Sequence, residues 1–167
     1  MPTKKIYLIV SDVRSSYNVG SLLRTADGLG IQEVFLCGYT PYPIGPNDSR
    51  LPHISRKTDL RIHKTALGAE SSQKWQHMQR AEDAITLLHN QSVTLIALEQ
   101  AKHSIPITDY KPLNDLAIVV GNEATGINQQ LLKMCDHILE IPMAGRKESF
   151  NVTVAAAIAL FYLKEML

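Results

Sequence analysis

Short runs of apolar, mostly β-branched residues alternate along the chain with stretches in which apolar positions recur at helical spacing. The apolar runs are too short for helices and are typical of strands buried on both faces of a sheet. The predicted strands are residues 6–10, 34–37, 93–98, 116–120 and 137–141. The predicted helices are residues 19–29, 80–90, 128–133 and 150–166. This alternation predicts an α/β fold with a mainly parallel sheet flanked by helices.

The same order of elements indicates where a site should lie. In sheets of this kind, active sites collect at the carboxyl ends of the strands, where loops lead into helices. The loops of interest therefore follow Val10, Leu98, Val120 and Ile141. A further stretch, residues 38–59, is rich in Pro, Gly, Asn, Asp and Ser and is predicted to be a long loop.

Length and composition narrow the class of protein. The chain has 167 residues, so we expect residues 1–167 to form a single domain. Hydrophobic residues make up 45% and charged residues 20%, which favours a soluble globular fold over a disordered chain. No apolar stretch approaches the roughly 20 residues that cross a bilayer, and no secretory leader pattern is present. With only two cysteines, both in apolar contexts, we expect a cytoplasmic protein without a membrane partner.

The net charge of +1 argues against attraction of nucleic acid by bulk charge but allows a local basic surface. Residues 50–64 form one candidate, with a local net charge of +4. A solvated loop face would explain this cluster equally well. Its basic residues are Arg50, Arg56, Lys57, Arg61 and Lys64.

Three glycine-containing segments at predicted strand-to-helix junctions hold the candidate chemistry, because glycine allows close backbone approach to a ligand. The first contains Asn18, which suits a helix N-cap, and Arg24, which could also be an ordinary surface residue. The second places Glu123 directly after a strand and a glycine turn, although a capping or solvated role is an alternative. The third leads into a helix near Ser149 and Asn151, which could simply cap that helix.

Several common chemistries are not supported by these segments. The first predicted strand-to-helix junction, residues 11–20, matches neither the dinucleotide-binding glycine pattern nor the phosphate-binding loop. The two cysteines are distant in sequence and the histidines show no ligand spacing, so no metal is expected. No Gly-x-Ser-x-Gly elbow or Cys/His pairing indicates acyl transfer.

Taken in order, the three segments resemble the motifs of the SpoU/TrmH family of S-adenosylmethionine-dependent RNA ribose 2'-O-methyltransferases, in the SPOUT superfamily. The family pattern Asn-x-Gly with a following Arg is similar to Asn18, Gly20 and Arg24. The patterns Gly-x-Glu-x-x-Gly and Ile-Pro-Met…Ser-Leu-Asn-Val-Ser-Val are similar to residues 121–126 and 141–154. The departures from the family pattern are Ala124 for Gly, Phe150 for Leu and Thr153 for Ser. Residues 64–70 also resemble a family segment, so the resemblance covers nearly the whole chain. The chain resembles the minimal form of the family, which consists of the catalytic domain.

The resemblance implies an α/β fold with a deep trefoil knot near the C-terminus, and a bound S-adenosylmethionine held by loops of that knot. The knot could not be predicted from periodicity, because knots are so rare in proteins. The residues that the resemblance places against the cofactor are Leu98, Glu99, Gly121, Ile141, Met143, Phe150 and Asn151.

The implied reaction requires a ribose hydroxyl to lose its proton while it attacks a methyl group. A guanidinium holds its proton with a pKa above about 12, so a role for Arg24 as simple base is unfavourable. We expect Arg24 to bind the adjacent phosphate and stabilise the developing alkoxide, with Glu123 orienting Arg24. The residues expected to position the ribose are Asn18, Ser149 and Asn151.

The expected partners are RNA and a second copy of the chain. The family is dimeric, and the small residues of 154–160 suit close helix packing, although packing within one subunit explains them nearly as well. We expect tRNA rather than ribosomal RNA as substrate, because a minimal domain has little surface for reading a large RNA. The expected RNA contacts are Arg14, Arg50, Arg56, Lys57, Arg61, Lys64, Arg146 and Lys147.

Three other functions are alternatives. The same chemistry could act on ribosomal RNA. A catalytically silent RNA-binding dimer is a second possibility, although the intact Arg24, Glu123 and Asn151 count against it. A nucleotide-dependent oxidoreductase is a third, and the missing glycine fingerprint counts against it.

Overall fold

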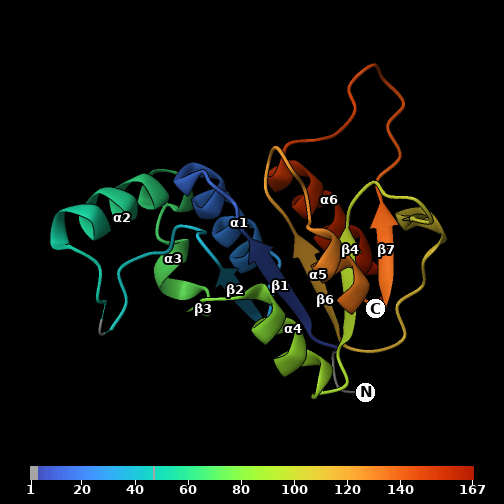
Figure 1. Ribbon diagram of the computed structural model, residues 1–167, viewed down its shortest axis with the longest axis horizontal. Helices are drawn as coiled ribbons and strands as arrows, with labels where there is room; N and C mark the ends of the chain where they lie inside the picture. The colour runs from blue at the N-terminus through green and yellow to red at the C-terminus, as the bar shows by residue number, and fades with distance from the viewer. Residues whose placement is uncertain (1–3, 47) are drawn as a thin grey trace.

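A sheet of seven parallel strands forms the centre of the computed structural model, which describes residues 4–46 and 48–167 (Figure 1). The strands lie in the order β3-β2-β1-β6-β4-β7-β5, and every pairing between neighbours is parallel. Their bounds are Ile6–Ser11 (β1), Glu33–Cys37 (β2), Trp75–Met78 (β3), Thr94–Leu98 (β4), Ile105–Pro106 (β5), Leu116–Val120 (β6) and His137–Glu140 (β7).

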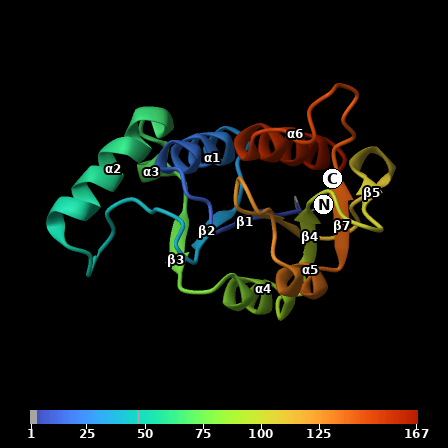
Figure 2. The same ribbon diagram turned by 45° about the horizontal axis from the view of Figure 1, so that its top comes forward.

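Helices cover both faces of this sheet (Figure 2). Helices α1 and α6 lie over one face, and α4 and α5 lie over the other. Helix α2 packs against α1 and extends away from the sheet. The bounds are Ser16–Gly28 (α1), Pro52–Ala66 (α2), Ala69–Ser72 (α3), Ala81–His89 (α4), Gln129–Met134 (α5) and Val152–Glu165 (α6), with a short 3-10 helix at Ile107–Asp109.

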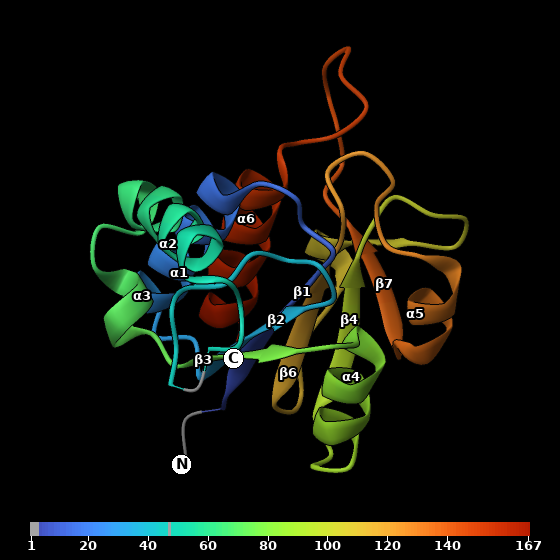
Figure 3. The ribbon, with the colours of Figure 1, turned by 60° about the vertical axis from the view of Figure 1, so that its left-hand side comes forward.

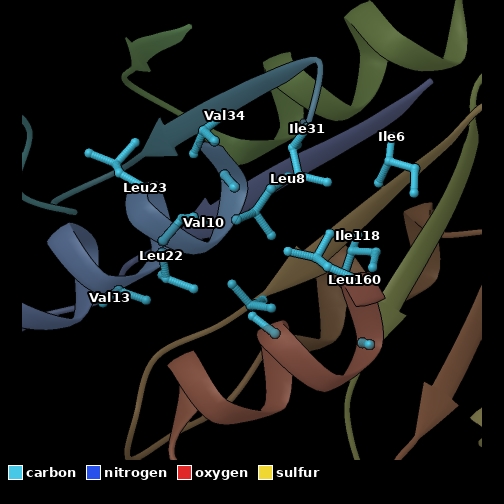
Figure 4. Packing of buried hydrophobic residues seen from close by; sticks show 14 of the residues in the cluster. Ile6, Leu8, Val10, Val13, Leu22, Leu23, Ile31, Val34, Ile118 and Leu160 are labelled. Carbon is cyan, nitrogen blue, oxygen red and sulfur yellow. The ribbon is translucent and has the colours of Figure 1, made fainter. Parts of the chain in front are cut away.

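Two hydrophobic cores explain why the central strands read as continuous apolar runs. Side chains of successive strand residues point to opposite faces, so each central strand supplies both cores. Leu8 and Ile118 pack beneath α1 and α6 (Figure 4). Ile9 and Val119 pack beneath α4 and α5. The prediction of an α/β fold with a parallel sheet flanked by helices is confirmed, and all five predicted strands and four predicted helices are present.

The predicted loop over residues 38–59 is wrong in its second half, because α2 begins at Pro52. Proline suits the first turn of a helix, where its missing N–H breaks no hydrogen bond. The apolar pattern of α2 is sparse, since its buried residues are only Ser55, Ile62 and Ala66. The sequence pattern also missed the edge strand β3, whose four residues are all half-buried.

Helix α1 starts earlier than predicted. Ser15 rather than Asn18 is the N-cap, and its side chain accepts a hydrogen bond from the Asn18 amide. Asn18 therefore lies within the first turn, where its own side chain is available for other contacts.

Two features of the fold bear on the site. Residues 142–151, between β7 and α6, project beyond the carboxyl edge of the sheet (Figure 3). Within residues 4–46 and 48–167, the helices are all too short or too polar to cross a membrane.

Candidate functional site

A cavity of about 510 Å³ lies at the carboxyl ends of three adjacent strands, β6, β4 and β7. This volume is in the range of small-molecule sites. The loops after these strands line it together with the first turns of α6. The predicted cofactor contacts that line it are Leu98, Glu99, Gly121, Ile141, Phe150 and Asn151. Met143, also predicted, lies in the projecting segment and is not among the lining residues.

The loop after β6 folds tightly upon itself, and Gly121 makes this possible. The backbones of Asn122 and Gly126 bond to each other in both directions, at 3.1 and 2.9 Å. A β-carbon at position 121 would lie 2.5 Å from backbone atoms of Gly126 and 2.6 Å from the amide nitrogen of Ile127. Only glycine fits this close backbone approach without moving the turn.

Glu99 joins the loop after β4 to this turn. Its carboxylate accepts hydrogen bonds from the amides of Ile127, at 2.9 Å, and Gln100, at 3.0 Å. A β-carbon at Gly126, whose φ is +67°, would lie 2.2 Å from an oxygen of Glu99. The carboxylate therefore packs directly on the turn and fixes one wall of the cavity.

Asn122 joins three loops at once. Its side-chain amide donates to the backbone oxygen of Asp12, at 2.9 Å, and to the hydroxyl of Tyr39, at 2.8 Å. Its side-chain oxygen accepts from the amides of Ala124 and Thr125. Asn122 is buried and lines the cavity, so the loops after β1, β2 and β6 meet at this residue.

Glu123 holds the start of α1. Its carboxylate accepts from the backbone amides of Arg14, at 2.9 Å, and Ser15, at 3.1 Å, and from the side-chain amide of Asn18, at 2.8 Å. Partial burial opposes ionisation, but these hydrogen bonds outweigh it and hold the pKa of Glu123 below its ordinary value. The carboxylate is thus charged at neutral pH.

The predicted pairing of Glu123 with Arg24 is not observed. All the hydrogen bonds that the described chain gives Glu123 from other residues come from residues 14–18. Arg24 lies on the exposed face of α1, about two turns further on, and is outside the cavity lining. The structure therefore links Glu123 to Asn18 and leaves the Arg24 guanidinium facing solvent.

At the start of α6, Asn151 is the N-cap, as the simpler interpretation predicted. Its side-chain oxygen accepts from the amide of Thr153, at 2.9 Å, and from the Thr153 hydroxyl, at 2.7 Å. Ser149 precedes it, and both residues line the cavity. Capping and ligand contact are compatible here, because a capped helix start presents polar groups to the cavity.

Helix α2 carries most of the predicted basic surface. Arg56, Lys57, Arg61 and Lys64 are all exposed on it, and no ion pair among the described residues involves them. Gly20 lets this helix approach α1, since a β-carbon there would lie 2.2 Å from the backbone oxygen of Ile62. Gly20, in the first motif segment, therefore allows close packing of α1 and α2 and does not shape a ligand site.

Arg50 is not part of that exposed surface. Its side chain is 17% exposed, pairs with Asp48 and donates to the backbone oxygens of Tyr42 and Pro43. Its guanidinium also packs 3.6 Å from the centre of the Tyr42 ring. The hydrogen bonds from Arg50 lower the pKa of Asp48 to about 2. Arg50 therefore holds the segment before α2 together.

The remaining predicted RNA contacts are also exposed. Arg14 follows β1, and Arg146 and Lys147 lie in the projecting segment 142–151. Among residues 4–46 and 48–167, no cluster of three side chains suited to a metal ion is present.

Sequence reasoning missed several residues that line or adjoin the cavity, and three of them have polar side chains that bear on the site. Gln100 and Asn122 line it, and Tyr39 bonds to Asn122. Asn122 stands between two residues that the motif singles out, so its position in the motif was a usable signal. Tyr39 lies in a segment with no motif, and only the pairing of the strands brings it to the site.

Comparison with known proteins identifies the family and shows the same fold. Residues 5–161 match the model of the SpoU rRNA Methylase family. The chain is 26% identical over 155 residues to the tRNA (guanosine(18)-2'-O)-methyltransferase of Escherichia coli K12, covering 91% of this chain and 59% of that protein. It is 29% identical over 157 residues to the 23S rRNA (guanosine-2'-O-)-methyltransferase RlmB of Vibrio vulnificus, covering 93% and 57%. The chain thus spans about three fifths of the length of these relatives.

Solved structures share the arrangement of the sheet and helices. An AdoMet-bound rRNA methyltransferase from Sinorhizobium meliloti superposes with a TM-score of 0.81 at 24% identity, over 98% of this chain and 57% of that one. A structure described as giving insights into the 2-OH methylation of C/U34 on tRNA superposes with a TM-score of 0.76 at 18% identity, over 98% and 97%. Because the family model matches nearly the whole chain, and residues of the second and third motif segments line one cavity, this protein belongs to the SpoU methylase family.

Proposed function

We propose that this protein transfers a methyl group from S-adenosylmethionine to a ribose 2'-hydroxyl of RNA. One observation carries the proposal: separate segments of the chain, at residues 98–100, 120–126, 140–141 and 149–152, converge on a single cavity. Those segments contain the residues that the family resemblance assigns to the cofactor. A structural role for each motif alone would not require them to meet.

The cavity has the character that this cofactor requires. Apolar side chains of Leu98, Ile141 and Phe150 suit an adenine ring, and the backbone around Gly121 allows close approach. The cavity also contains carboxylates, which complement a positively charged sulfonium. When bound, S-adenosylmethionine supplies an electrophilic methyl group.

The polar residues of the chain divide the remaining tasks. Arg24 binds the phosphate beside the target ribose through two hydrogen bonds and stabilises charge on the attacking oxygen. Asn18 is held in place by Glu123 and positions the ribose, together with Ser149 and Asn151 at the start of α6. Glu123 acts through Asn18 and the start of α1, rather than on Arg24.

The first test is whether the purified protein methylates RNA. Incubation with S-adenosylmethionine and total RNA, followed by mass spectrometry of nucleosides, should show a new ribose-methylated nucleotide. Calorimetry with S-adenosylmethionine separates this function from that of a silent RNA-binding protein, which would release no binding heat. Absence of both methylation and cofactor binding would refute the proposal.

Arg24→Lys tests the assigned role of the guanidinium. Lysine keeps the charge but cannot make a two-pronged contact with phosphate, so we expect kcat to fall at least about 10-fold with cofactor affinity unchanged. Arg80→Lys, on the face of the sheet covered by α4, is the matched control and should behave as wild type. Near-normal turnover by Arg24→Lys would show that no bidentate contact is needed.

Within this function we propose tRNA as the substrate. The relatives act on both kinds of RNA by name, so sequence similarity alone does not separate them. Support comes from the structure on tRNA methylation, which the chain matches over 97% of that protein's length. Presenting tRNA and ribosomal RNA separately in the assay above tests this choice, since methylation confined to ribosomal RNA would contradict it.

We further propose a homodimer formed through α6. Val154, Ile158 and Phe161 lie at helical spacing and are all exposed, Phe161 by 57%, which gives an unpartnered apolar stripe. The family resemblance supports a second copy as the partner. Phe161→Glu should convert a dimer to a monomer in light scattering, and a monomeric wild type would refute the dimer.

The trefoil knot is also a proposal, supported by family membership and by the loops of β6 and β7 meeting at one cavity. A knotted chain should refold slowly after complete denaturation, because threading precedes packing. Refolding as fast as that of an unknotted α/β domain of this size would count against it.

A further inference from the structure

Tyr39 is an exposed aromatic residue whose two ends are both held by hydrogen bonds. It lies in the turn directly after β2, and 61% of its surface is exposed. Single exposed tyrosines are common on protein surfaces and by themselves indicate nothing. Tyr39 differs because its backbone and its hydroxyl are each fixed to other loops at the carboxyl edge of the sheet.

The register of three strands explains this position. In the sheet, Ser11 of β1 pairs with Cys37 of β2, and Val10 of β1 pairs with Val120 of β6. The residues that follow these strands therefore emerge side by side. They include Asp12, Tyr39 and Asn122.

The backbone around Tyr39 is rigidly supported. Its amide donates to a carboxylate oxygen of Asp12, at 3.1 Å. The preceding residue is Gly38, with φ of +66°, where a β-carbon would lie 2.1 Å from that same oxygen. The following residue, Thr40, is buried, and its hydroxyl donates to the backbone oxygen of Val10 in β1 and accepts from the amide of Val13 in the loop after it.

The far end of the side chain reaches the cavity. The Tyr39 hydroxyl oxygen accepts from the side-chain amide of Asn122, at 2.8 Å, and Asn122 lines the cavity. The ring thus spans the surface from the end of β2 to the rim of the cavity. Arg14, whose side chain is exposed, lies on the neighbouring loop and bonds through its amide to Glu123.

We propose that the Tyr39 ring is a stacking platform for a base of the RNA substrate, within one nucleotide of the methylated ribose. The inference rests on the proposed function. Unpaired RNA bases are bound largely by stacking on aromatic side chains. A ring already fixed at both ends loses little conformational freedom when a base stacks on it. Its position at the cavity rim places the stacked base next to the sugar that reacts.

Three substitutions of Tyr39 separate stacking from other roles. Tyr39→Ala removes the ring and should raise the KM for RNA about 5- to 100-fold, with kcat and the affinity for S-adenosylmethionine little changed. Tyr39→Phe keeps the ring but loses the bond to Asn122, and should stay within about 3-fold of wild type. Tyr39→Leu keeps apolar bulk without a flat ring and should resemble the alanine variant. Leu113→Ala, another exposed apolar residue, is the control.

The platform predicts a specific coupling with the RNA. Once the methylated nucleotide is mapped, abasic residues can be placed at that nucleotide and at each neighbour. One of these abasic sites should raise the KM for RNA of the wild type as much as the Tyr39→Ala substitution does. The same abasic site should raise the KM of the Tyr39→Ala variant little further, because both changes remove the same contact.

The possible outcomes are distinct. If Tyr39→Phe is as defective as Tyr39→Ala, the hydroxyl bond rather than stacking matters and the platform is refuted. If Tyr39→Ala has a normal KM for RNA, the platform is refuted. It is also refuted if every abasic site raises the KM of Tyr39→Ala as much as it raises that of the wild type. In both cases the proposed methylation of RNA is unaffected. If the wild type neither binds nor methylates RNA, the proposed function itself fails and the platform falls with it.

Discussion

The cavity loops and helix α2 are held to the rest of the protein in contrasting ways. Around the cavity, Glu99, Asn122 and Glu123 each bond to backbone groups of other loops, so the position of each wall is fixed by several contacts. Helix α2 rests on α1 at Gly20 and presents its charged side chains to solvent. The role of the cavity loops therefore depends on precise geometry, whereas the role of α2 depends on its charge. Single conservative changes should therefore damage the first and leave the second nearly intact.

Gly121→Ala should have the largest effect and tests whether geometry governs the cavity. The added carbon would meet backbone atoms at 2.5 Å, so the turn at residues 121–126 must move. We expect affinity for S-adenosylmethionine to fall at least about 100-fold, with a loss of stability of about 1–3 kcal/mol, measured by calorimetry and chemical denaturation. Gly145→Ala, in the projecting segment with nothing within 4 Å, is the matched control. Wild-type cofactor affinity in Gly121→Ala would show that the turn adapts.

Glu123→Gln should have the next largest effect. Glutamine has nearly the same shape but lacks the negative charge of the carboxylate, which accepts three hydrogen bonds. The start of α1 should therefore be held less tightly to the loop after β6. We expect kcat/KM to fall about 10- to 100-fold and the Arg14 and Ser15 amides to exchange hydrogen faster. Glu148→Gln, on an exposed carboxylate of the projecting segment, should change neither property.

The pKa of Glu123 gives this prediction a pH dependence. Because the folded state lowers the pKa, its hydrogen bonds stabilise α1 above the ordinary carboxyl pKa and are lost as pH falls through the lowered value. In that acid range the Arg14 and Ser15 amides of the wild type should lose protection from exchange, measured relative to the intrinsic exchange rate at each pH. If Glu123→Gln shows the same acid response, another group is responsible.

Charge reversal on α2 should have a moderate effect that is confined to RNA binding. Replacing Arg56 and Lys57 by Glu should weaken RNA binding about 10- to 100-fold at low salt and flatten its salt dependence. Affinity for S-adenosylmethionine should not change. Reversal of Lys111 and Lys133 is a control with the same change in net charge. Equal weakening by both pairs would mean that total charge, rather than the α2 surface, determines affinity.

The contact between His63 and Glu70 should have the smallest effect. The hydrogen bond that His63 donates to the Glu70 carboxylate raises the pKa of His63 above its ordinary value. The contact therefore stabilises the fold below the ordinary pKa and is lost as pH rises through the raised pKa. His63→Gln should lower the melting temperature slightly at about pH 6 and not at all by about pH 9. A difference that persists at high pH would mean that packing, not charge, supports α2 here.

The sequence predicts regions with strong local signals and misses those that depend on register. Continuous apolar runs identified the central strands, and two of the glycine-bearing motif segments contain residues that line the cavity. Arg50 was predicted to contact RNA, but its guanidinium forms an ion pair with Asp48, two residues earlier. Tyr39 and Asn122 have no detectable relation in sequence, because 83 residues separate them and only strand pairing joins them.

The partners of Glu123 lie 105 to 109 residues away along the chain. On the ribosome, the start of α1 therefore emerges long before the carboxylate that supports it. A nascent chain that ends before β6 lacks both this anchor and the floor of the cavity. The cavity should consequently form only after residues 120–126 and 149–152, which line it, have been synthesised.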